Sequence, residues 1–362
     1  MKNNVLSQFV LNRRALGVLS FGAALSACGG GGSDDVGSDD DNKDTEVFRV
    51  EVIDSGLPYK ILSNDGEYVF LQHIAVGASG SIYTHTYNSS EIEQRKPDGT
   101  LIRSLPFPIE KSKSPFQIGV VEDPKTNDIF ISGAYVNLGS RGSRVDGGFI
   151  ARFTQQSSQI LFKSDTVAPA GLARDKEGNL YFMDMKKGDV LCLNPSKNEI
   201  KVIYRVAYDK KFDEADTDFG GIYIQCKVAV ADNGAVYAYL KSQGHRSSET
   251  YQKGVLRLRN SRVDSISDLN TCDFGTYGNS LFFLSSAEGE ISPRISRVDA
   301  AGVISTVTEK LNTLGSTQFG SPGALSQHTS WIDMSPDGRI HLRSENEGED
   351  PHFYTVRLQS QG

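Results

Sequence analysis

The sequence predicts an all-β protein: a six-bladed β-propeller of four-stranded antiparallel blades, the last of them closed by an N-terminal strand. Three features predict this fold: a repeated residue pair, turn residues before each pair, and an alternating segment before the first repeat. The pairs join an aliphatic residue to an aromatic one or to histidine, and they are Ile82-Tyr83, Ile129-Phe130, Leu180-Tyr181, Val236-Tyr237, Leu281-Phe282 and Ile340-His341. Successive pairs lie 47, 51, 56, 45 and 59 residues apart, an interval typical of one propeller blade.

Turn-forming residues come just before every pair. They are Gly80, Asn127-Asp128, Glu177-Gly178-Asn179, Asp232-Asn233-Gly234, Gly278-Asn279 and Pro336-Asp337-Gly338. Glycine, asparagine and aspartate tolerate the backbone conformations that tight hairpins need. Each pair is therefore expected to begin the second strand of its blade.

The two ends of the predicted propeller domain are expected to complete its last blade together. Phe353 to Leu358 supplies a third strand for the last repeat, and only four residues follow. The alternating segment Phe48 to Ile53 has no repeat of its own. We expect it to form the missing outer strand, which would close the ring and remove open sheet edges.

Residues 1–27 have the pattern of a signal peptide. Basic residues precede the run Ala15 to Ala24, which is too short to span a bilayer. Leu25-Ser26-Ala27-Cys28 resembles a bacterial lipobox, which implies lipidation of Cys28 and anchoring to a membrane. Gly29 resembles the sorting signal of outer-membrane lipoproteins. We expect a location in the cell envelope, at the outer membrane, on either its periplasmic or its surface side.

The export route is open on sequence grounds. Asn12 to Leu16 partly resembles a twin-arginine signal, and the general secretory route is the alternative.

Residues 28–46 form an acidic linker rich in glycine, serine and aspartate. It has seven acidic residues against Lys43 and almost no apolar side chain, so it is expected to remain an extended tether. The whole chain carries a formal charge of −7. The propeller domain, residues 47–362, has no basic stripe, and nucleic acid is therefore not expected as a partner.

Three cysteines remain after Cys28, so at most one internal disulfide can form. Cys226 and Cys272 fall in predicted inner strands of adjacent blades, which leaves a bridge between them open. Buried free thiols at Cys192, Cys226 and Cys272 are the favoured interpretation, because cysteine packs well as a small apolar residue.

The repeats resemble those of NHL and regucalcin/gluconolactonase-like propellers. The resemblance rests on Gly171 to Phe182 and on the turns Pro97 to Thr100 and Ser335 to Gly338, and it covers most of residues 70–358. It implies a divalent cation held by a glutamate, an asparagine and an aspartate. Ala170 stands where the family asparagine precedes Gly-Leu-Ala, and His73 to Val76 lacks the glutamate. The lactonase interpretation fails at both positions.

The connections on one face of the predicted propeller are long and unequal. They are Ala134 to Gly148, Ala207 to Gly221, Lys241 to Gly254, Asn312 to Ser330 and Arg343 to His352. Long loops on a rigid scaffold commonly carry function. The candidate binding residues on this face are His73, His245, His328 and His352. His328 is also the candidate catalytic base, but the glutamate that a streptogramin-lyase-like site would need is not identifiable.

Two acidic loops offer oxygen ligands for a divalent cation, and no other cofactor is indicated. The first contains Asp213, Asp216 and Asp218, and the second contains Glu345, Glu347, Glu349 and Asp350. Neither has EF-hand spacing, and a solvated loop is the alternative for each.

We expect a membrane-anchored binding module whose loop-rich face holds a protein, a peptide or a glycan. The alternative is an envelope hydrolase or lyase with its site at the mouth of the central channel; whether the chain is an enzyme stays open. A third hypothesis is a structural role in envelope assembly, which resembles that of another outer-membrane lipoprotein propeller.

Overall fold

The computed structural model describes residues 48–54, 60–62, 68–86, 89–108, 114–139, 142–205, 225–243, 250–251, 255–259, 262–266, 270–286, 294–308, 331–335, 337–344 and 352–360. They all belong to the compact unit Thr45–Gly362. Within these ranges the chain forms strands, and no helix long and apolar enough to cross a membrane is found.

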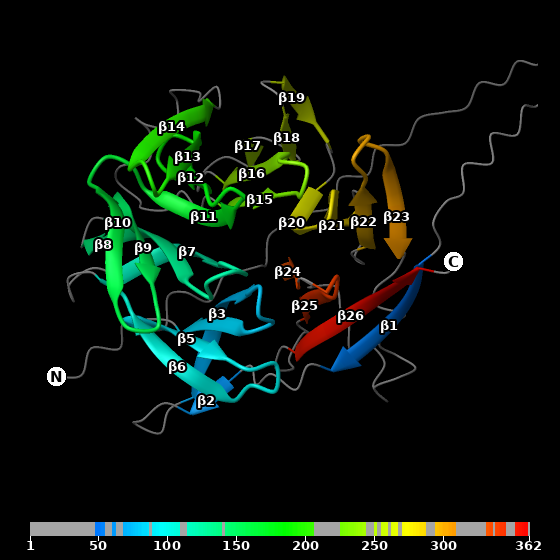
Figure 1. Ribbon diagram of the computed structural model, residues 1–362, viewed down its shortest axis with the longest axis horizontal. Coiled ribbons are helices and arrows are strands. Elements are labelled where there is room, and N and C mark those ends of the chain that lie inside the picture. Colours follow the sequence, from blue (N-terminus) through cyan, green and yellow to red (C-terminus); the bar gives the residue numbers. More distant parts are fainter. Residues whose placement is uncertain are drawn as a thin grey trace, which may run out of the picture. The chain divides into compact units, whose positions relative to one another are not determined.

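The strands form six antiparallel sheets, each built on four strands that follow one another from the inside outward (Figure 1). These four strands are in sequence order in five sheets, whereas the last sheet takes its outermost strand from the beginning of the domain. The first strands are β3 (Tyr68–Val76), β7 (Ser114–Glu122), β11 (Pro169–Arg174), β15 (Gln225–Val230), β20 (Asn270–Tyr277) and β24 (Trp331–Met334). The second strands are β4 (Ile82–Thr86), β8 (Ile129–Gly139), β12 (Leu180–Asp184), β16 (Val236–Gln243), β21 (Ser280–Ser286) and β25 (Ile340–Ser344).

The outer half of each sheet consists of its third and fourth strands. The third strands are β5 (Glu91–Arg95), β9 (Gly142–Phe153), β13 (Val190–Asn194), β18 (Leu256–Arg259), β22 (Arg294–Val298) and β26 (His352–Ser360). The fourth strands are β6 (Leu101–Pro106), β10 (Ser158–Ser164), β14 (Glu199–Tyr204), β19 (Arg262–Ser265), β23 (Ile304–Thr308) and β1 (Phe48–Asp54). Two short strands, β2 (Lys60–Leu62) and β17 (Thr250–Tyr251), extend the sheets of β3 and β16.

The first strands lie side by side around a closed ring. Contacts join β3 to β7, then β11, β15, β20, β24 and β3 again. The predicted all-β propeller of four-stranded antiparallel blades is therefore confirmed. Each repeated pair lies at the start of a second strand, and its aliphatic member is at most 4 % exposed. The turns before them use left-handed residues, such as Gly80 with φ of 80° and Asn127 with φ of 57°.

The N-terminal strand closes the last sheet, as predicted. β1 pairs antiparallel with β26 from Phe48 opposite Ser360 to Asp54 opposite Tyr354. The last sheet thus takes its outer strand from the beginning of the domain and its other three strands from the end. This arrangement ties the two ends of the domain together.

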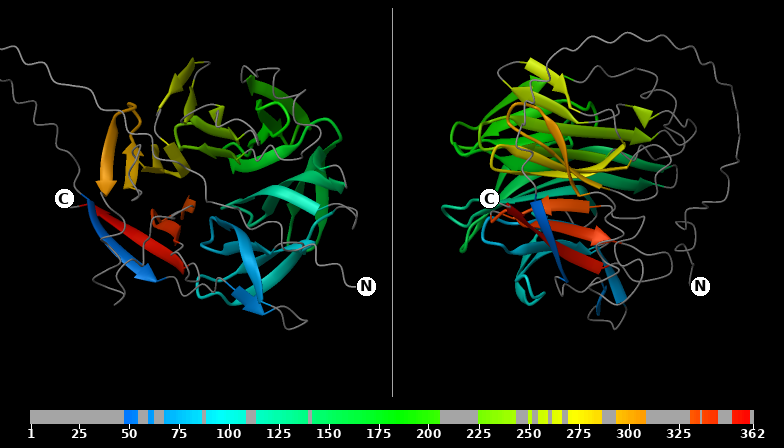
Figure 2. Two further views of the ribbon diagram at one scale, coloured as in Figure 1. Left: turned by 180° about the vertical axis from the view of Figure 1, so that it is seen from behind. Right: turned by 90° about the vertical axis from the view of Figure 1, so that its right-hand side faces the viewer.

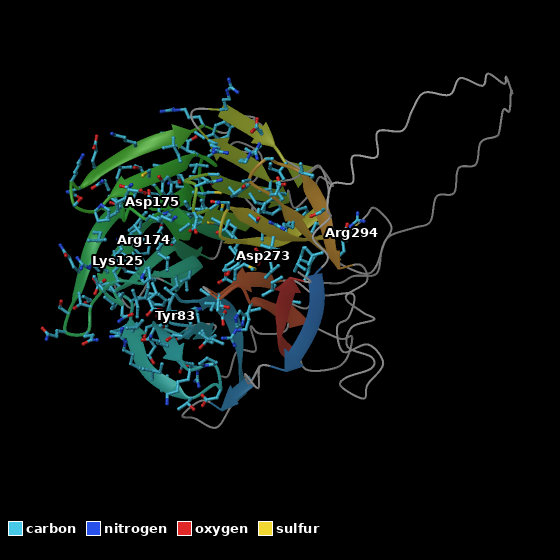
Figure 3. All side chains as sticks on the ribbon, turned by 45° about the vertical axis from the view of Figure 1, so that its right-hand side comes forward. Tyr83, Lys125, Arg174, Asp175, Asp273 and Arg294 are labelled. Carbon is cyan, nitrogen blue, oxygen red and sulfur yellow. The ribbon has the colours of Figure 1, made fainter. Side chains whose placement is uncertain are left out.

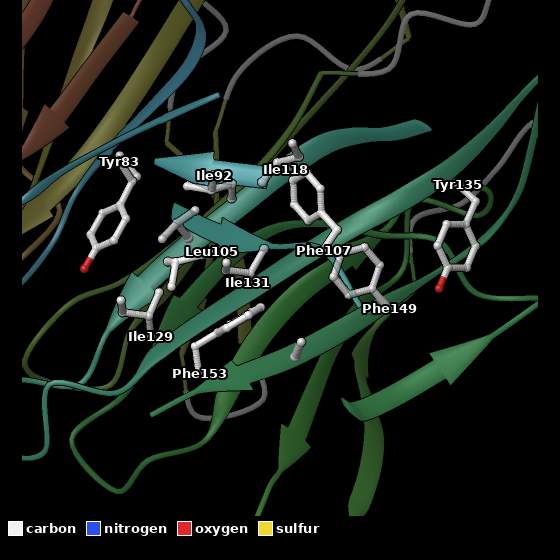
Figure 4. Close-up of a cluster of buried hydrophobic side chains, with 13 residues drawn as sticks. Tyr83, Ile92, Leu105, Phe107, Ile118, Ile129, Ile131, Tyr135, Phe149 and Phe153 are labelled. Carbon is white, nitrogen blue, oxygen red and sulfur yellow. The ribbon is translucent and has the colours of Figure 1, made fainter. Parts of the chain in front are cut away.

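Apolar side chains fill the space between neighbouring sheets. In the cluster between the sheets of β3 and β7 (Figure 4), Phe107 meets Phe149 edge to face at 5.9 Å, and Tyr135 stacks on Phe149 at 5.8 Å. Tyr83, Ile129 and the other members of this cluster are buried. Packing of this kind fixes how neighbouring sheets sit beside one another and makes a rigid frame for the connections.

Candidate functional site

The topology separates the connections onto two faces. Because strands alternate in direction, each first strand begins on the same face on which its second strand ends. We call this the entry face; Figure 2 shows the strands running between it and the opposite face. The opposite face has the tight turns between first and second strands and between third and fourth strands. Of the predicted binding residues, His73 and His352 belong to described strands, at positions near the entry face.

Two predicted loops on the entry face are partly strand, which corrects the sequence analysis. Residues 134–148 form the end of β8 and the start of β9, paired through Gly139 opposite Gly142. Residues 241–254 include the end of β16 and β17, with Gln243 opposite Thr250. Glycine, serine and charged residues in these segments suggested loops, but backbone pairing across the hairpins overrides that composition.

The hairpin of β8 and β9 extends past its neighbours in the sheet. β7 pairs with β8 as far as Val136, and β10 pairs with β9 as far as Gly148. Among the described strands, residues 137–139 and 142–144 therefore pair only with each other. They form a two-stranded projection on the entry face.

Most of the predicted site residues lie outside the described part of the chain. This applies to His245, His328, Asp213, Asp216 and Asp218, and also to Cys28 at the start of the acidic linker.

Two of the predicted histidines have a described backbone. His73 lies in β3 directly opposite His85 of β4, near the entry face. His352 is the first residue of β26 and lies opposite Ser344. His85 is buried and its Nε2 lies 3.1 Å from the carbonyl oxygen of Ser89. Burial lowers the pKa of His85 and so favours the neutral imidazole.

The register reveals a repeated position on the first strands. The second member of each repeated pair lies opposite a small or aliphatic residue in five sheets: Ala75, Val121, Ala173, Ala229 and Gly275. In the sixth sheet, Asp333 lies opposite His341. Asp333 thus replaces the small or aliphatic residue of the other sheets, and His341 replaces their aromatic ring.

Three charged residues of the first strands form what we call the inner charged cluster: Lys227, Asp273 and Asp333. Lys227 Nζ lies 2.9 Å from Asp273 Oδ1 and donates to the carbonyl oxygen of Ile332 at 2.8 Å. Asp273 Oδ2 accepts from the Ile332 N–H at 3.0 Å. The sheets of β15, β20 and β24 are thereby joined through one ammonium and one carboxylate (Figure 3 labels Asp273).

Asp333 continues the cluster to the first sheet. Its Oδ2 accepts from the Val76 N–H of β3 at 2.8 Å, and its Oδ1 accepts from the Met334 N–H at 2.9 Å. The hydrogen bond from the Val76 N–H crosses the junction between the last sheet and the first. Asp273 and Asp333 each accept a hydrogen bond from a backbone N–H of the next first strand around the ring.

Burial raises the pKa of Asp273 and of Asp333, and the Lys227 ammonium opposes this shift at both. The Phe274 N–H adds a further donor to Asp273 Oδ1 at 2.9 Å. With these donors in place, the carboxylates act as acceptors that bridge strands. The sequence analysis missed this cluster, although Asp333, at a first-strand position that is small or aliphatic in the other five sheets, was a usable signal.

The junction between the second and third sheets is built differently. A Cβ added to Gly119 of β7 would lie 2.5 Å from the carbonyl carbon of Gly171 and from the Leu172 nitrogen. The two first strands therefore approach backbone to backbone, where only glycine fits. Ala170, which the sequence analysis compared with a metal-binding asparagine of the lactonases, is fully buried in an apolar cluster with Ala168, Met183 and Cys226.

Cys192 and Cys226 are free thiols, which agrees with the favoured interpretation. Burial raises the pKa of both, so neither is activated as a thiolate nucleophile. Among the residues that the structure describes, no group of three or more His, Cys, Asp or Glu side chains is placed to hold a metal ion.

Comparison with solved structures supports the fold. A protein of unknown function from Dyadobacter fermentans is 11 % identical, with a TM-score of 0.56, over 86 % of this chain and 99 % of that one. A Hadza microbial sialidase is 10 % identical, with a TM-score of 0.52, over 84 % and 68 %. Streptogramin B lyase is 13 % identical over 86 % and 98 %, with a TM-score of 0.49.

No family model and no curated protein matches the sequence. At these identities the similarity to solved structures establishes a shared β-propeller fold, on which the known examples carry different activities.

Proposed function

We propose that this chain is a lipoprotein of the cell envelope, anchored at the outer membrane through Cys28. In this proposal, its propeller binds a protein, a peptide or a glycan through the entry face. The observation that carries the binding role is the pair of hairpins, β8–β9 and β16–β17, that extend from two sheets on this face.

A paired hairpin suits binding because its backbone is already ordered. Cross-strand pairing orders residues 135–139 and 142–147 before any partner arrives, so little conformational entropy is lost on association. The rigid packing between sheets holds the base of the hairpin. Projecting, ordered elements of this kind favour a macromolecular partner that lies across the face.

The inner charged cluster also favours binding over catalysis. A general base needs a titratable group that is available to the substrate at working pH. The oxygens of Asp273 and Asp333 instead accept backbone N–H groups of neighbouring strands, and Lys227 bridges two sheets. These charges contribute to the integrity of the ring.

One observation favours the alternative, an envelope hydrolase or lyase. His73 lies opposite the neutral, buried His85 near the entry face, and a neutral imidazole can accept a proton. If the chain is such an enzyme, His73→Ala and His85→Phe should each abolish turnover of a substrate found by screening lactones, glycosides and cyclic peptides. Binding of a partner to a chain without turnover would favour the first proposal.

The binding proposal is tested by crosslinking in intact envelopes followed by affinity capture of the chain. One variant replaces residues 137–145 with Asn-Gly, and a second replaces residues 244–249 in the same way. The control places Asn-Gly at Gln155-Gln156, a turn of the same sheet on the opposite face. We expect a partner that is captured by the wild type and the control and lost in a hairpin variant. Capture of the same partner by both hairpin variants, at the level of the wild type, would contradict the proposal.

A further inference from the structure

The outer edge of the third sheet has unusual exposure. β14 is the last strand of its sheet, and no described strand pairs with its outer edge. Its first five residues, Glu199 to Ile203, are all exposed. The other outer strands with a complete burial pattern, β6 and β10, each contain partly or fully buried positions. β14 therefore offers its edge and both of its faces to solvent.

Three of the exposed side chains of β14 are apolar. Ile200, Val202 and Ile203 are 36 %, 42 % and 41 % exposed. An edge strand with β-branched side chains and free backbone groups is a template for pairing with another extended segment. Natural proteins protect such an edge with charged side chains, proline, a bulge or a covering element. β14 has Lys201 and a bulge, and its residues Glu199 to Ile203 nevertheless remain exposed.

A bulge limits the usable length of the edge. Val190 and Leu191 of β13 lie opposite Tyr204 and Val202, so Ile203 is an extra residue in β14. A bulge twists the strand and interrupts regular pairing. The regular edge is therefore Glu199 to Val202, which fits a short strand.

The charges around this edge indicate what it would pair with. Lys197, Lys201 and Arg205 are exposed along β14, with Glu199 as the single acid among them. Lys201 Nζ lies 3.4 Å from Glu199 Oε1, and Arg205 interacts electrostatically with Asp189. These three basic and two acidic groups leave one excess positive charge beside the edge. The chain as a whole is acidic, with a formal charge of −7. The basic character of β14 is thus local, and it is complementary to an acidic segment.

We propose that β14 is a strand-addition site for an extended segment of a partner protein that combines acidic and aliphatic side chains. The partner's backbone would continue the sheet beyond β14, its aliphatic side chains would cover Ile200 and Val202, and its carboxylates would lie beside Lys197 and Lys201. The site lies on the rim of the ring and is independent of the entry face, so it goes beyond the function proposed above.

The probe is a fluorescent eight-residue peptide of alternating glutamate and valine, titrated with the purified full chain in an anisotropy assay. A second peptide has the same sequence with N-methyl groups on alternate amides, which block strand pairing but keep charge and side chains. A third peptide carries lysine in place of glutamate. We expect binding of the first peptide, and at least about tenfold weaker binding of the other two, because backbone pairing and charge complementarity both contribute.

Variants locate the binding. The Lys197→Glu/Lys201→Glu variant and the Ile200→Thr variant should each weaken binding by about fivefold or more, whereas Lys163→Glu and Ile160→Thr on β10 should leave it unchanged. These residues are surface-exposed or partly exposed, so thermal unfolding should confirm that all four variants fold. Equal binding of the N-methylated peptide, equal loss in the β10 variants, or no binding would each overturn the proposal. Sedimentation is the remaining check: self-association abolished by Ile200→Thr would assign the edge to a second copy and would also overturn it.

Discussion

Replacing Lys227 with methionine tests whether the inner charged cluster holds the ring together. Methionine keeps most of the apolar stem and removes the ammonium. The variant loses the contact to Asp273 Oδ1 at 2.9 Å and the hydrogen bond to the Ile332 carbonyl at 2.8 Å. It also leaves the Asp273 carboxylate, which is 8 % exposed, without its counter-charge.

The magnitude follows from these contacts. Removing one partner of a fully buried ion pair costs about 3–5 kcal/mol. Here Asp273 keeps the Phe274 and Ile332 N–H donors, and the Lys227 side chain is 26 % exposed, so the cost is smaller. Loss of a charge-assisted hydrogen bond costs about 1.5–3 kcal/mol. We expect Lys227→Met to lower the free energy of unfolding by about 2–3 kcal/mol.

Urea unfolding at pH 7, followed by intrinsic fluorescence, measures this change. With an m-value of about 3 kcal/mol/M, the midpoint should fall by about 0.7–1 M. The matched control is Lys176→Met, because Lys176 lies 3.8 Å from Asp232 with both side chains well exposed. An exposed pair of this kind contributes about 0.5 kcal/mol or less.

A double-mutant cycle separates the ion pair from general damage. If Lys227 acts by compensating Asp273, then Lys227→Met combined with Asp273→Asn should cost at least about 1 kcal/mol less than the sum of the two single changes. The reasoning is refuted if Lys227→Met costs no more than Lys176→Met, or if the two single changes simply add.

Three further predictions concern the frame. Burial lowers the pKa of His341 to about 4, so the unfolded chain takes up a proton first and stability falls as pH drops from about 6.5 toward 4. His341→Phe should remove this loss. Its free energy of unfolding relative to that of the wild type should therefore rise by up to about 3 kcal/mol as the pH falls over that range. A difference in urea midpoint between the two proteins that does not change with pH would contradict this. Gly119→Ala should cost about 2–3 kcal/mol because its Cβ would meet the backbone of Gly171, against about 1 kcal/mol for Gly234→Ala, which meets no atom within 4 Å; similar urea midpoints would contradict this. Deleting residues 47–54 should strongly lower the thermal midpoint, because β26 would lose its partner; an unchanged midpoint would show that ring closure does not depend on β1.

Much of the fold could be predicted because its determinants are local. A glycine or asparagine turn followed by a buried aliphatic residue marks the start of each second strand, and such turns restrict the backbone without help from distant residues. The closing strand could be predicted because Phe48 to Ile53 alternates and the last repeat lacks an outer strand. The hairpin through residues 134–148 could not, because its pairing depends on the strand opposite and not on its glycine-rich composition.

The inner charged cluster was not predicted, because it is made by contacts between repeats. Lys227, Asp273 and Asp333 lie in three different repeats, and each looks like an ordinary strand residue beside its sequence neighbours. The register of the first strands shows that Asp333 stands where the other five repeats have small or aliphatic residues. Lys227 and Asp273 share a different first-strand position, which holds His73, Gly119, Ala170 and Trp331 in the other repeats. Comparing repeats position by position would have revealed the departure, although not the partners.

The ring therefore uses two kinds of junction. Gly119 and Gly171 bring two first strands into backbone contact, whereas Lys227, Asp273 and Asp333 bridge the junctions from β15 round to β3 with charged side chains. This distinction explains the exceptional pair in the sixth sheet. Asp333 reaches forward to the Val76 N–H, so the position opposite His341 cannot hold the small residue on which an aromatic ring packs elsewhere. The junction that Asp333 bridges is also the one where the chain closes on itself. There the Val76 N–H of β3 donates a hydrogen bond to the Asp333 carboxylate, which adds to β1 in fixing the last sheet against the first. His341 accompanies this carboxylate where the other sheets have an aromatic ring.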